Sequence, residues 1–317
     1  MRRSFIPYIV PVLAAFFCLS CKKDDEQTET LPYLYGLDFE LPTFARPGDS
    51  FTLEAGGVYY VEGDGVEEYT YKWTVNSDEA VEGKTFTLTV QEVGNYTVKC
   101  QASDPDGNYY AVSTSKLLIV IDPALGKTLN GTEIYAFEPH ITDARDKKGE
   151  NDYFYTRKGN LDWFRNNLAW TGAGVPYENA DVTSYPLGRY YTWNEAMTAC
   201  PEGWRLPTDE EWETLGNDAG ALTVEAYLNS NRMWEYWPQI TRTNDSGMSV
   251  IPSGYTLVGK SAPSYKRLYD YAAFWTATES ASDPSLARYR YIYVEEEDVK
   301  ATYGDKASLA LSVRCVR

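Results

Sequence analysis

The chain has 317 residues, 43% of them hydrophobic and 24% charged, and a formal net charge of −17. This composition is typical of a globular protein of about two domains and excludes a disordered or collagen-like chain. The acidity argues against nucleic-acid binding, which needs a basic surface, and a single histidine, His140, argues against histidine-dependent catalysis or a multi-histidine metal site.

The N-terminus has the pattern of a secretory signal. Arg2 and Arg3 precede a mainly apolar stretch, residues 5–19, which is shorter than the roughly 20 residues that span a bilayer as a helix. The stretch ends at Ser20-Cys21, and a charged run over residues 22–26 follows. This arrangement resembles the lipobox of bacterial lipoproteins, and the charged run is similar to the export signal on surface lipoproteins of Bacteroides-type bacteria.

The resemblance implies that residues 1–20 are removed as a signal peptide and that Cys21 becomes acylated. Residues 21–33 would then form a polar tether. The partner implied is the lipid bilayer, held through Cys21, and the location is the exposed surface of the outer membrane of a Gram-negative cell. The alternative is an ordinary cleaved signal followed by an unrelated cysteine.

Residues 34–123 show short alternating segments, typical of the strands of a β-sandwich. Apolar residues share one strand face within residues 69–75, 86–90 and 96–102. We expect Trp73 in the core, and we expect Cys100, the one cysteine of this segment, to be a buried free thiol. The sequence Asp104-Pro-Asp-Gly-Asn108 predicts a turn between strands, which we favour over a calcium site.

Three motifs of this segment resemble those of PKD-like and other Ig-like modules. They are Tyr69-Thr-Tyr-Lys-Trp73, Gly94-Asn-Tyr-Thr-Val98 and the turn from Asp104 to Asn108. The resemblance implies an all-β sandwich.

Residues 124–317 have a different pattern, that of an α+β domain. Thr192 to Glu195 and Thr208 to Glu211 both match the capping box, which predicts short helices over residues 193–199 and 209–215. Alternation over residues 309–315 predicts a last strand. Cys200 and Cys315, the two cysteines of this domain, end the first helix and lie on the apolar face of that strand, so we expect a disulfide between them.

Four motifs in this region occur in one order. They are Cys200-Pro-Glu-Gly-Trp204-Arg-Leu-Pro-Thr208-Asp-Glu-Glu-Trp212, Asn244-Asp-Ser-Gly-Met-Ser-Val-Ile-Pro-Ser-Gly-Tyr255, Phe274-Trp-Thr-Ala-Thr-Glu279 and Ser312-Val-Arg-Cys-Val316. This set resembles the Fibrobacter succinogenes-type major paralogous domain of secreted and surface bacterial proteins. That family is similar to the formylglycine-generating-enzyme branch of the C-type-lectin-like fold, which implies a fold but not an activity.

No catalytic residue, metal ligand or cofactor is predicted, and we do not expect an enzyme. Glu210, Glu211 and Glu213 are explained by helix capping and a solvated helix face, and residues 295–298 by an exposed hairpin tip. The tryptophans of the family motifs are expected in the core, namely Trp163, Trp193, Trp204, Trp212 and Trp275.

A ligand site is predicted between the motifs, where loops on a rigid scaffold carry binding residues. The candidate residues are Arg232, Trp234, Glu235, Tyr236 and Trp237. An exposed ring of Trp234 or Trp237 would stack on a sugar, although these rings would cap the domain's own core in the alternative interpretation.

These features favour a surface-anchored binding or adhesion lipoprotein, with a glycan recognised by the C-terminal lectin-like domain. One alternative is a carbohydrate-active or redox enzyme in that domain. Another is a structural subunit of a surface assembly, held by a surface-protein partner.

Overall fold

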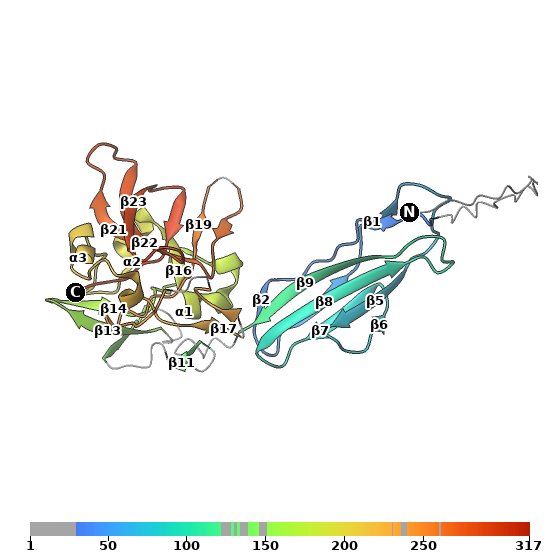
Figure 1. Ribbon diagram of the computed structural model, residues 1–317, viewed down its shortest axis with the longest axis horizontal. Coiled ribbons are helices and arrows are strands. Elements are labelled where there is room, and N and C mark those ends of the chain that lie inside the picture. Colours follow the sequence, from blue (N-terminus) through green and yellow to red (C-terminus); the bar gives the residue numbers. More distant parts are fainter. Residues whose placement is uncertain are drawn as a thin grey trace, which may run out of the picture.

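The computed structural model describes residues 30–121, 128–129, 132–133, 139–145, 151–229, 231–235, 240–259 and 261–317. The predicted signal peptide and the lipidation site Cys21 lie outside these residues. Two domains are joined end to end, and the first described residues lie at the end of the N-terminal domain that is remote from the C-terminal domain (Figure 1). Among the described helices, none has the length and apolar character needed to cross a membrane.

The N-terminal domain is a β-sandwich. Its larger sheet has the order β2-β9-β8-β5-β6, β3 pairs with β7, and β1 pairs with β4. The strands are β1 (Leu34–Tyr35), β2 (Phe44–Ala45), β3 (Ser50–Glu54), β4 (Tyr59–Tyr60), β5 (Thr70–Val75), β6 (Val81–Glu82), β7 (Thr85–Thr89), β8 (Gly94–Ser103) and β9 (Val112–Val120).

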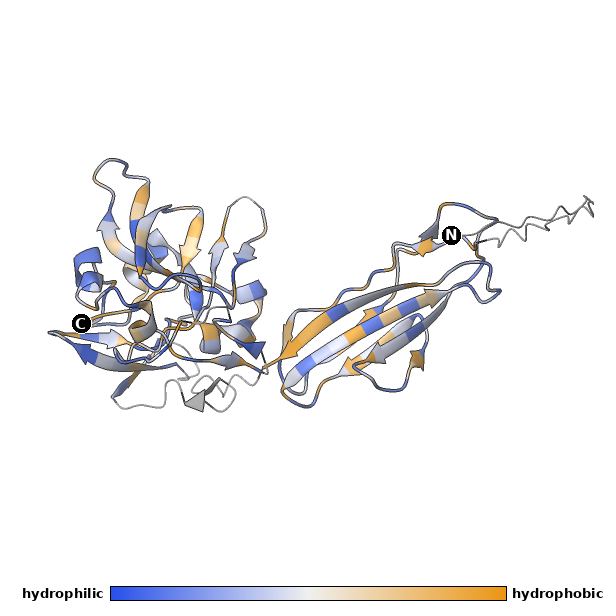
Figure 2. Ribbon diagram, viewed as in Figure 1, coloured by the Kyte–Doolittle hydropathy of each residue, from blue (hydrophilic) through white to orange (hydrophobic). Residues whose placement is uncertain are grey.

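The predicted alternation forms the core of this sandwich. Val98, Cys100 and Ala102 on β8 are fully buried, and Trp73 of β5 is buried as expected. The alternation is visible as stripes along β8 (Figure 2). Cys100 is free, and burial raises the pKa of its thiol to about 11, so it stays protonated at neutral pH.

The predicted turn connects β8 to β9. The carboxylate of Asp104 accepts the backbone N–H of Asp106 at 3.1 Å and that of Asn108 at 2.7 Å. Gly107 takes a φ of +76°, which glycine adopts without steric cost. The first carboxylate of this acidic cluster therefore organises the turn.

The C-terminal domain is built from several small sheets with few, short helices. The main sheets have the orders β12-β13-β14, β15-β16-β24-β19-β20 and β21-β22-β23. The strands are β10 (Thr128–Leu129), β11 (Thr132–Glu133), β12 (His140–Thr142), β13 (Asp152–Lys158), β14 (Leu161–Phe164), β15 (Val175–Pro176), β16 (Arg189–Thr192), β17 (Tyr227–Leu228), β18 (Asn231–Arg232), β19 (Tyr255–Leu257), β20 (Ser264–Lys266), β21 (Tyr271–Glu279), β22 (Leu286–Tyr293), β23 (Lys300–Asp305) and β24 (Leu309–Leu311). The helices are α1 (Ser184–Leu187), α2 (Trp193–Ala199), α3 (Asp209–Glu213) and α4 (Ala219–Leu222), with 3₁₀ turns η2 (Tyr177–Asn179) and η3 (Asp181–Thr183).

Both predicted capping boxes are present. The carboxylate of Glu195 accepts the backbone N–H of Thr192 at 2.8 Å, and that of Glu211 accepts the N–H of Thr208 at 2.8 Å. Helix α2 has the predicted bounds. Helix α3 ends two residues earlier than predicted, at Glu213, and the chain turns at Gly216, whose φ is +86°.

The last segment, residues 309–317, runs through the middle of the C-terminal domain. β24 pairs with β16 on one side and with β19 on the other. Beyond β24, Ser312 forms a bridge to Phe274 of β21. Val316 then forms a bridge to Trp163 of β14. The segment therefore joins all three main sheets, which explains why both of its faces are buried.

Arg314 is fully buried in this segment, and alternation alone did not predict its burial. Its Nε donates to Asn167 Oδ1 at 2.7 Å, and its Nη1 donates to the carbonyl oxygens of Met248 at 2.7 Å and Phe164 at 3.1 Å. A buried cation is tolerated when its donors find acceptors. The hydrogen bonds of Arg314 therefore attach two distant parts of the chain to this last segment.

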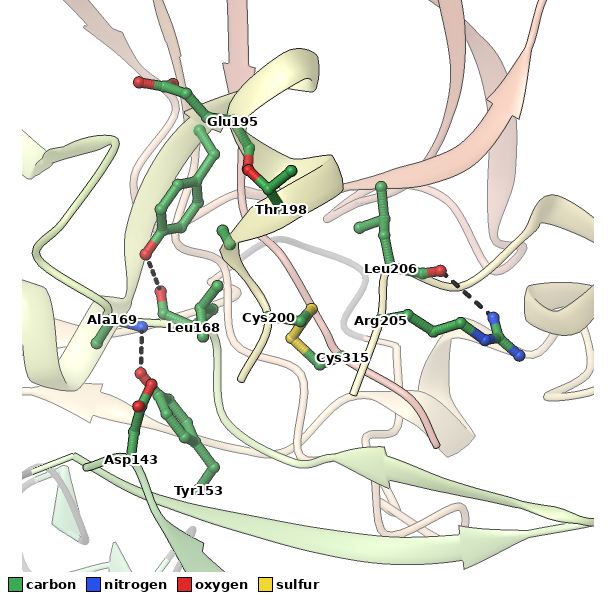
Figure 3. The surroundings of a disulfide bond; sticks show 12 residues. Asp143, Tyr153, Leu168, Ala169, Glu195, Thr198, Cys200, Arg205, Leu206 and Cys315 are labelled. Carbon is green, nitrogen blue, oxygen red and sulfur yellow. Dashed lines mark hydrogen bonds between the residues drawn. A yellow bond between two sulfur atoms is a disulfide. The ribbon is translucent and has the colours of Figure 1, made fainter. Parts of the chain in front are cut away.

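The predicted disulfide between Cys200 and Cys315 is confirmed. The two Cα atoms are 5.9 Å apart, and the bond closes a sequence separation of 115 residues. Figure 3 shows the bond between the end of α2 and the last segment, near Arg205 and Leu206. It therefore fastens α2 to the central segment of the domain.

An apolar cluster joins the two domains. Phe44, Ile119 and Ile121 of the sandwich are packed with residues of the C-terminal domain, which are Phe154, Val182, Leu187, Ala226, Leu228, Met233 and Ile251. Beside this cluster, Asn229 Nδ2 donates to Asn95 Oδ1 at 2.9 Å. Because Asn229 lies in the turn between β17 and β18, this hairpin contacts both domains.

Replacing both Cys200 and Cys315 by serine should lower the free energy of unfolding by up to about 4–5 kcal/mol, because the unfolded chain regains the entropy of the open loop. Urea unfolding followed by tryptophan fluorescence measures the change. Cys100→Ala is the control, since it leaves the disulfide intact and should have a much smaller effect. A double variant with the wild-type urea midpoint would show that the bond adds no stability.

Arg314→Met should lower the free energy of unfolding by about 3 kcal/mol or more, because buried carbonyl oxygens lose their donor. The matched control is Arg205→Met, in which a half-exposed ion pair with Glu211 is removed at a cost of about 1 kcal/mol or less. Equal urea midpoints for the two variants would contradict a structural role of the Arg314 hydrogen bonds.

Candidate functional site

The candidate site is formed by the part of the sequence that follows α4 and precedes the turn that begins at Asn244. Strands β17 and β18 form a hairpin in which Tyr227 faces Arg232 and Leu228 faces Asn231. Asn229, in the connecting turn, has a φ of +52°. Tight hairpin turns require such a conformation, and asparagine adopts it more readily than most residues. The hairpin places Arg232 at its open end, directly before Met233 and Trp234.

Trp234 is a buried ring with an unusual backbone. It is 3% exposed, and its φ of +61° is rare for a large side chain. Its backbone N–H donates to the carbonyl of Tyr269 at 2.8 Å, and its Nε1 donates to the carbonyl of Val250 at 3.4 Å. These bonds hold the ring in place against a local strain of about 1–2 kcal/mol.

Arg242 lies over the ring of Trp234, with its guanidinium carbon 4.4 Å from the ring centroid. Its Nη1 donates to Thr223 Oγ1 at 2.9 Å. Thr223 is itself fixed, because its hydroxyl donates to the carbonyl of Ala219 in α4 at 2.7 Å. Burial, together with the charge of Arg232, lowers the pKa of Arg242 to about 10.

Arg232 is the second cation of the site, and it is paired. Its Nη2 lies 3.2 Å from Glu225 Oε1, and the hydroxyl of Tyr227 donates to the same carboxylate at 2.8 Å. Glu225 thus neutralises Arg232 and also raises the pKa of Tyr227, which stays protonated.

A pocket of about 350 Å³ brings these groups together. Its lining residues are Glu225, Arg232, Met233, Trp234, Ile240, Thr241 and Arg242. Two guanidinium groups and one carboxylate meet there, so the pocket is positive in a chain whose net charge is −17. Such a lining can hydrogen-bond a polar ligand and attract an anion.

The structure brings two of the five predicted ligand residues, Arg232 and Trp234, into this pocket. The prediction that an exposed Trp234 ring stacks on a sugar is wrong. The ring is buried in the core, and Arg242 lies over it. Glu235 is exposed and does not line the pocket. Tyr236 and Trp237 lie outside the described residues, so a role for them stays a prediction.

The sequence patterns do not identify Arg242, Glu225 or Thr241 as pocket residues. They are isolated polar residues with no periodicity or motif, and only the fold brings them together. A weak signal was available in Arg242, a lone base in the polar stretch from Thr241 to Gly247.

The tryptophans of the sequence motifs belong to the scaffold, as predicted. Trp163, Trp193, Trp204, Trp212 and Trp275 are each at most 8% exposed. Asn244, which begins the second motif, accepts the backbone N–H of Ser249 through Oδ1 at 2.8 Å. The motif residues therefore build the core and its turns, and the pocket is formed by the chain between the motifs.

Among solved structures, one similar chain is the PKD domain of the human VPS10 domain-containing receptor SorCS2, studied in solution. The two are 15% identical with a TM-score of 0.23, over 39% of this chain and 96% of that chain. The comparison with curated proteins found no match.

Two family models match the chain. The PKD domain model matches residues 37–115, within the β-sandwich. The Fibrobacter succinogenes major domain model matches residues 126–317, which is more than half of the chain. The protein therefore carries a PKD domain and belongs, through its larger domain, to the Fibrobacter succinogenes major domain family.

Proposed function

We propose that this protein is a surface-anchored binding lipoprotein whose C-terminal domain recognises a glycan in the pocket around Arg232 and Arg242. The observation that carries the proposal is the pocket itself. Its volume of about 350 Å³ lies within the range of small-ligand sites. Guanidinium groups present several N–H donors in a fixed plane, which suits the closely spaced oxygens of a sugar.

The position of the pocket supports a binding role. The motif residues form the core, whereas the pocket is lined by seven described residues of the stretch between the first two motifs. Binding residues concentrate on such connections, because they can vary without loss of the fold. A C-type-lectin-like arrangement of the domain is part of this proposal and rests on the resemblance of its motifs.

The pocket favours binding over hydrolysis. Glycosidases use two carboxyl groups about 5–10 Å apart. Of the described residues that line the pocket, Glu225 is the only carboxylate, and it is already paired with Arg232. A bound sugar would therefore be held and not cleaved.

The anchoring part of the proposal rests on the N-terminal sequence. Cys21 and the charged run after it resemble a lipoprotein signal, and the β-sandwich follows the tether predicted over residues 21–33. Because the first described residues lie at the end of the sandwich remote from the C-terminal domain, an anchor at Cys21 would present that domain outward (Figure 1).

Thr241→Trp should weaken glycan binding at least about tenfold, because the exposed Thr241 lines the pocket and a large ring there would fill it. A glycan array probed with the full chain in detergent identifies the ligand, and titration calorimetry then measures the affinities. The matched control is Thr243→Trp, two residues further on, which is also exposed and is not part of the lining.

Both threonine variants should keep the wild-type melting temperature, since neither side chain is buried. Equal affinities of Thr241→Trp and wild type for the identified glycan would place the site elsewhere on the molecule.

Cys21→Ala should release the protein from membranes or leave its signal uncleaved, because acyl chains anchor only through this thiol. Detergent phase partitioning and the mass of the N-terminal peptide provide the measurement, with Cys18→Ala as the control. Unchanged partitioning and processing of Cys21→Ala would refute lipidation at this residue.

A further inference from the structure

We propose that the ligand of this pocket is an acidic glycan, whose carboxylate or sulfate group pairs with Arg242. This inference rests on the proposed glycan-binding function and adds the chemical class of the sugar.

Arg242 differs from most arginines of its domain, because no carboxylate among the described residues pairs with it. Nine others in the described residues from 139 onward form ion pairs with Asp or Glu, and they are Arg145, Arg157, Arg189, Arg205, Arg232, Arg267, Arg288, Arg290 and Arg317. Across that same part of the chain, Arg242 donates to Thr223 and lies on Trp234, and no Asp or Glu pairs with it. The protein has 46 acidic residues and 29 basic ones, yet the cation of Arg242 in this pocket has no anionic partner among the described residues. An anionic ligand would supply that partner.

The remaining guanidinium donors are held ready for such a ligand. A guanidinium carries five N–H groups. Among the described residues, only the hydroxyl of Thr223 accepts a hydrogen bond from Arg242, from its Nη1. The ring of Trp234 below and the hydroxyl of Thr223 at one side restrict the rotation of the group. A planar fork fixed in this way matches the two oxygens of a carboxylate or sulfate.

Arg232, the second arginine of the pocket, does not compete for the anion, because it is already paired with Glu225. The pair of Arg232 with Glu225 and the hydroxyl of Tyr227 form a polar wall that can bond neutral hydroxyl groups of the same sugar. The pocket therefore offers one site for a charge and one for hydroxyl groups, as an acidic sugar requires.

The partial burial of Arg242 makes the pairing favourable. Its lowered pKa shows that the surroundings penalise the cation, yet a value of about 10 keeps it protonated at neutral pH. An anion in the pocket would compensate this penalty, and a neutral ligand would not.

The test compares ligands that differ at one kind of charged group. The full chain in detergent is titrated with oligogalacturonate and its methyl ester, with sialyllactose and its methyl ester, and with a sulfated disaccharide and its unsulfated form. We expect the wild type to bind at least one acidic member at least about tenfold more tightly than its neutral match. The pair that shows the preference tells a carboxylate ligand from a sulfate ligand.

Two variants of Arg242 assign the preference to this residue, and two variants at other positions serve as comparisons. Arg242→Gln should bind the acidic and neutral members equally, and Arg242→Lys should keep part of the preference, because the charge stays and the fork is lost. Glu225→Gln leaves Arg242 and Trp234 in place and should strengthen binding of the acid, since it removes a repelling carboxylate and releases Arg232 from its ion pair. Lys99→Gln, an exposed lysine on β8 of the other domain, makes the same charge change as Arg242→Gln and should have no effect.

The outcomes separate the two proposals. Equal binding of acidic and neutral glycans by the wild type would overturn the acidic-ligand inference and leave glycan binding standing. If no glycan binds, inorganic sulfate is titrated against wild type and Arg242→Gln. Sulfate binding that Arg242→Gln abolishes would support the anion site and refute the glycan function, and the absence of both would refute both proposals.

Discussion

The buried guanidinium of Arg314 is the constraint on which the C-terminal domain depends. It lies in the segment that joins all three main sheets, and it is bonded to backbone carbonyls near Phe164 and near Met248. Because a buried cation without acceptors would cost several kcal/mol, those two segments must come to it as the domain folds. Cys315, the next residue, is covalently bonded to the end of α2. Two adjacent residues thus attach three separate parts of the chain to the last segment of the domain.

The same domain uses arginine in two opposite ways. Arg314 has no exposure to solvent, and its donors point to protein oxygens. Arg242 lines a pocket, is supported by a ring and one hydroxyl, and retains donors that no described residue accepts. The first arrangement stabilises a fold, and the second prepares a surface for a ligand. This contrast separates the scaffold, made from the sequence motifs, from the segment between them, where function is proposed.

Local signals made much of the fold predictable. The capping boxes located α2 and α3, because the bonds that end a helix involve residues only three positions apart. Alternation located β5, β7 and β8 for a similar reason. The burial of Trp234 agrees with the alternative interpretation of its segment, in which the ring caps the domain's own core. The burial of Arg314 was not predicted, since it depends on segments that are distant in sequence. Arg242 was missed because a lone arginine carries no pattern, and it stands out only in the folded chain, where no carboxylate of the described residues pairs with it.

The hairpin of β17 and β18 has a mechanical consequence. Arg232 at its open end lines the pocket, and Asn229 at its turn is bonded to Asn95 in the N-terminal domain. Leu228 and Met233 add apolar contacts across the same junction. A pull on anything held in the pocket would therefore pass along one short hairpin into β8, a long central strand of the sandwich. The packed contacts between the two domains would therefore carry part of the force, and the chain that connects the domains would carry the rest.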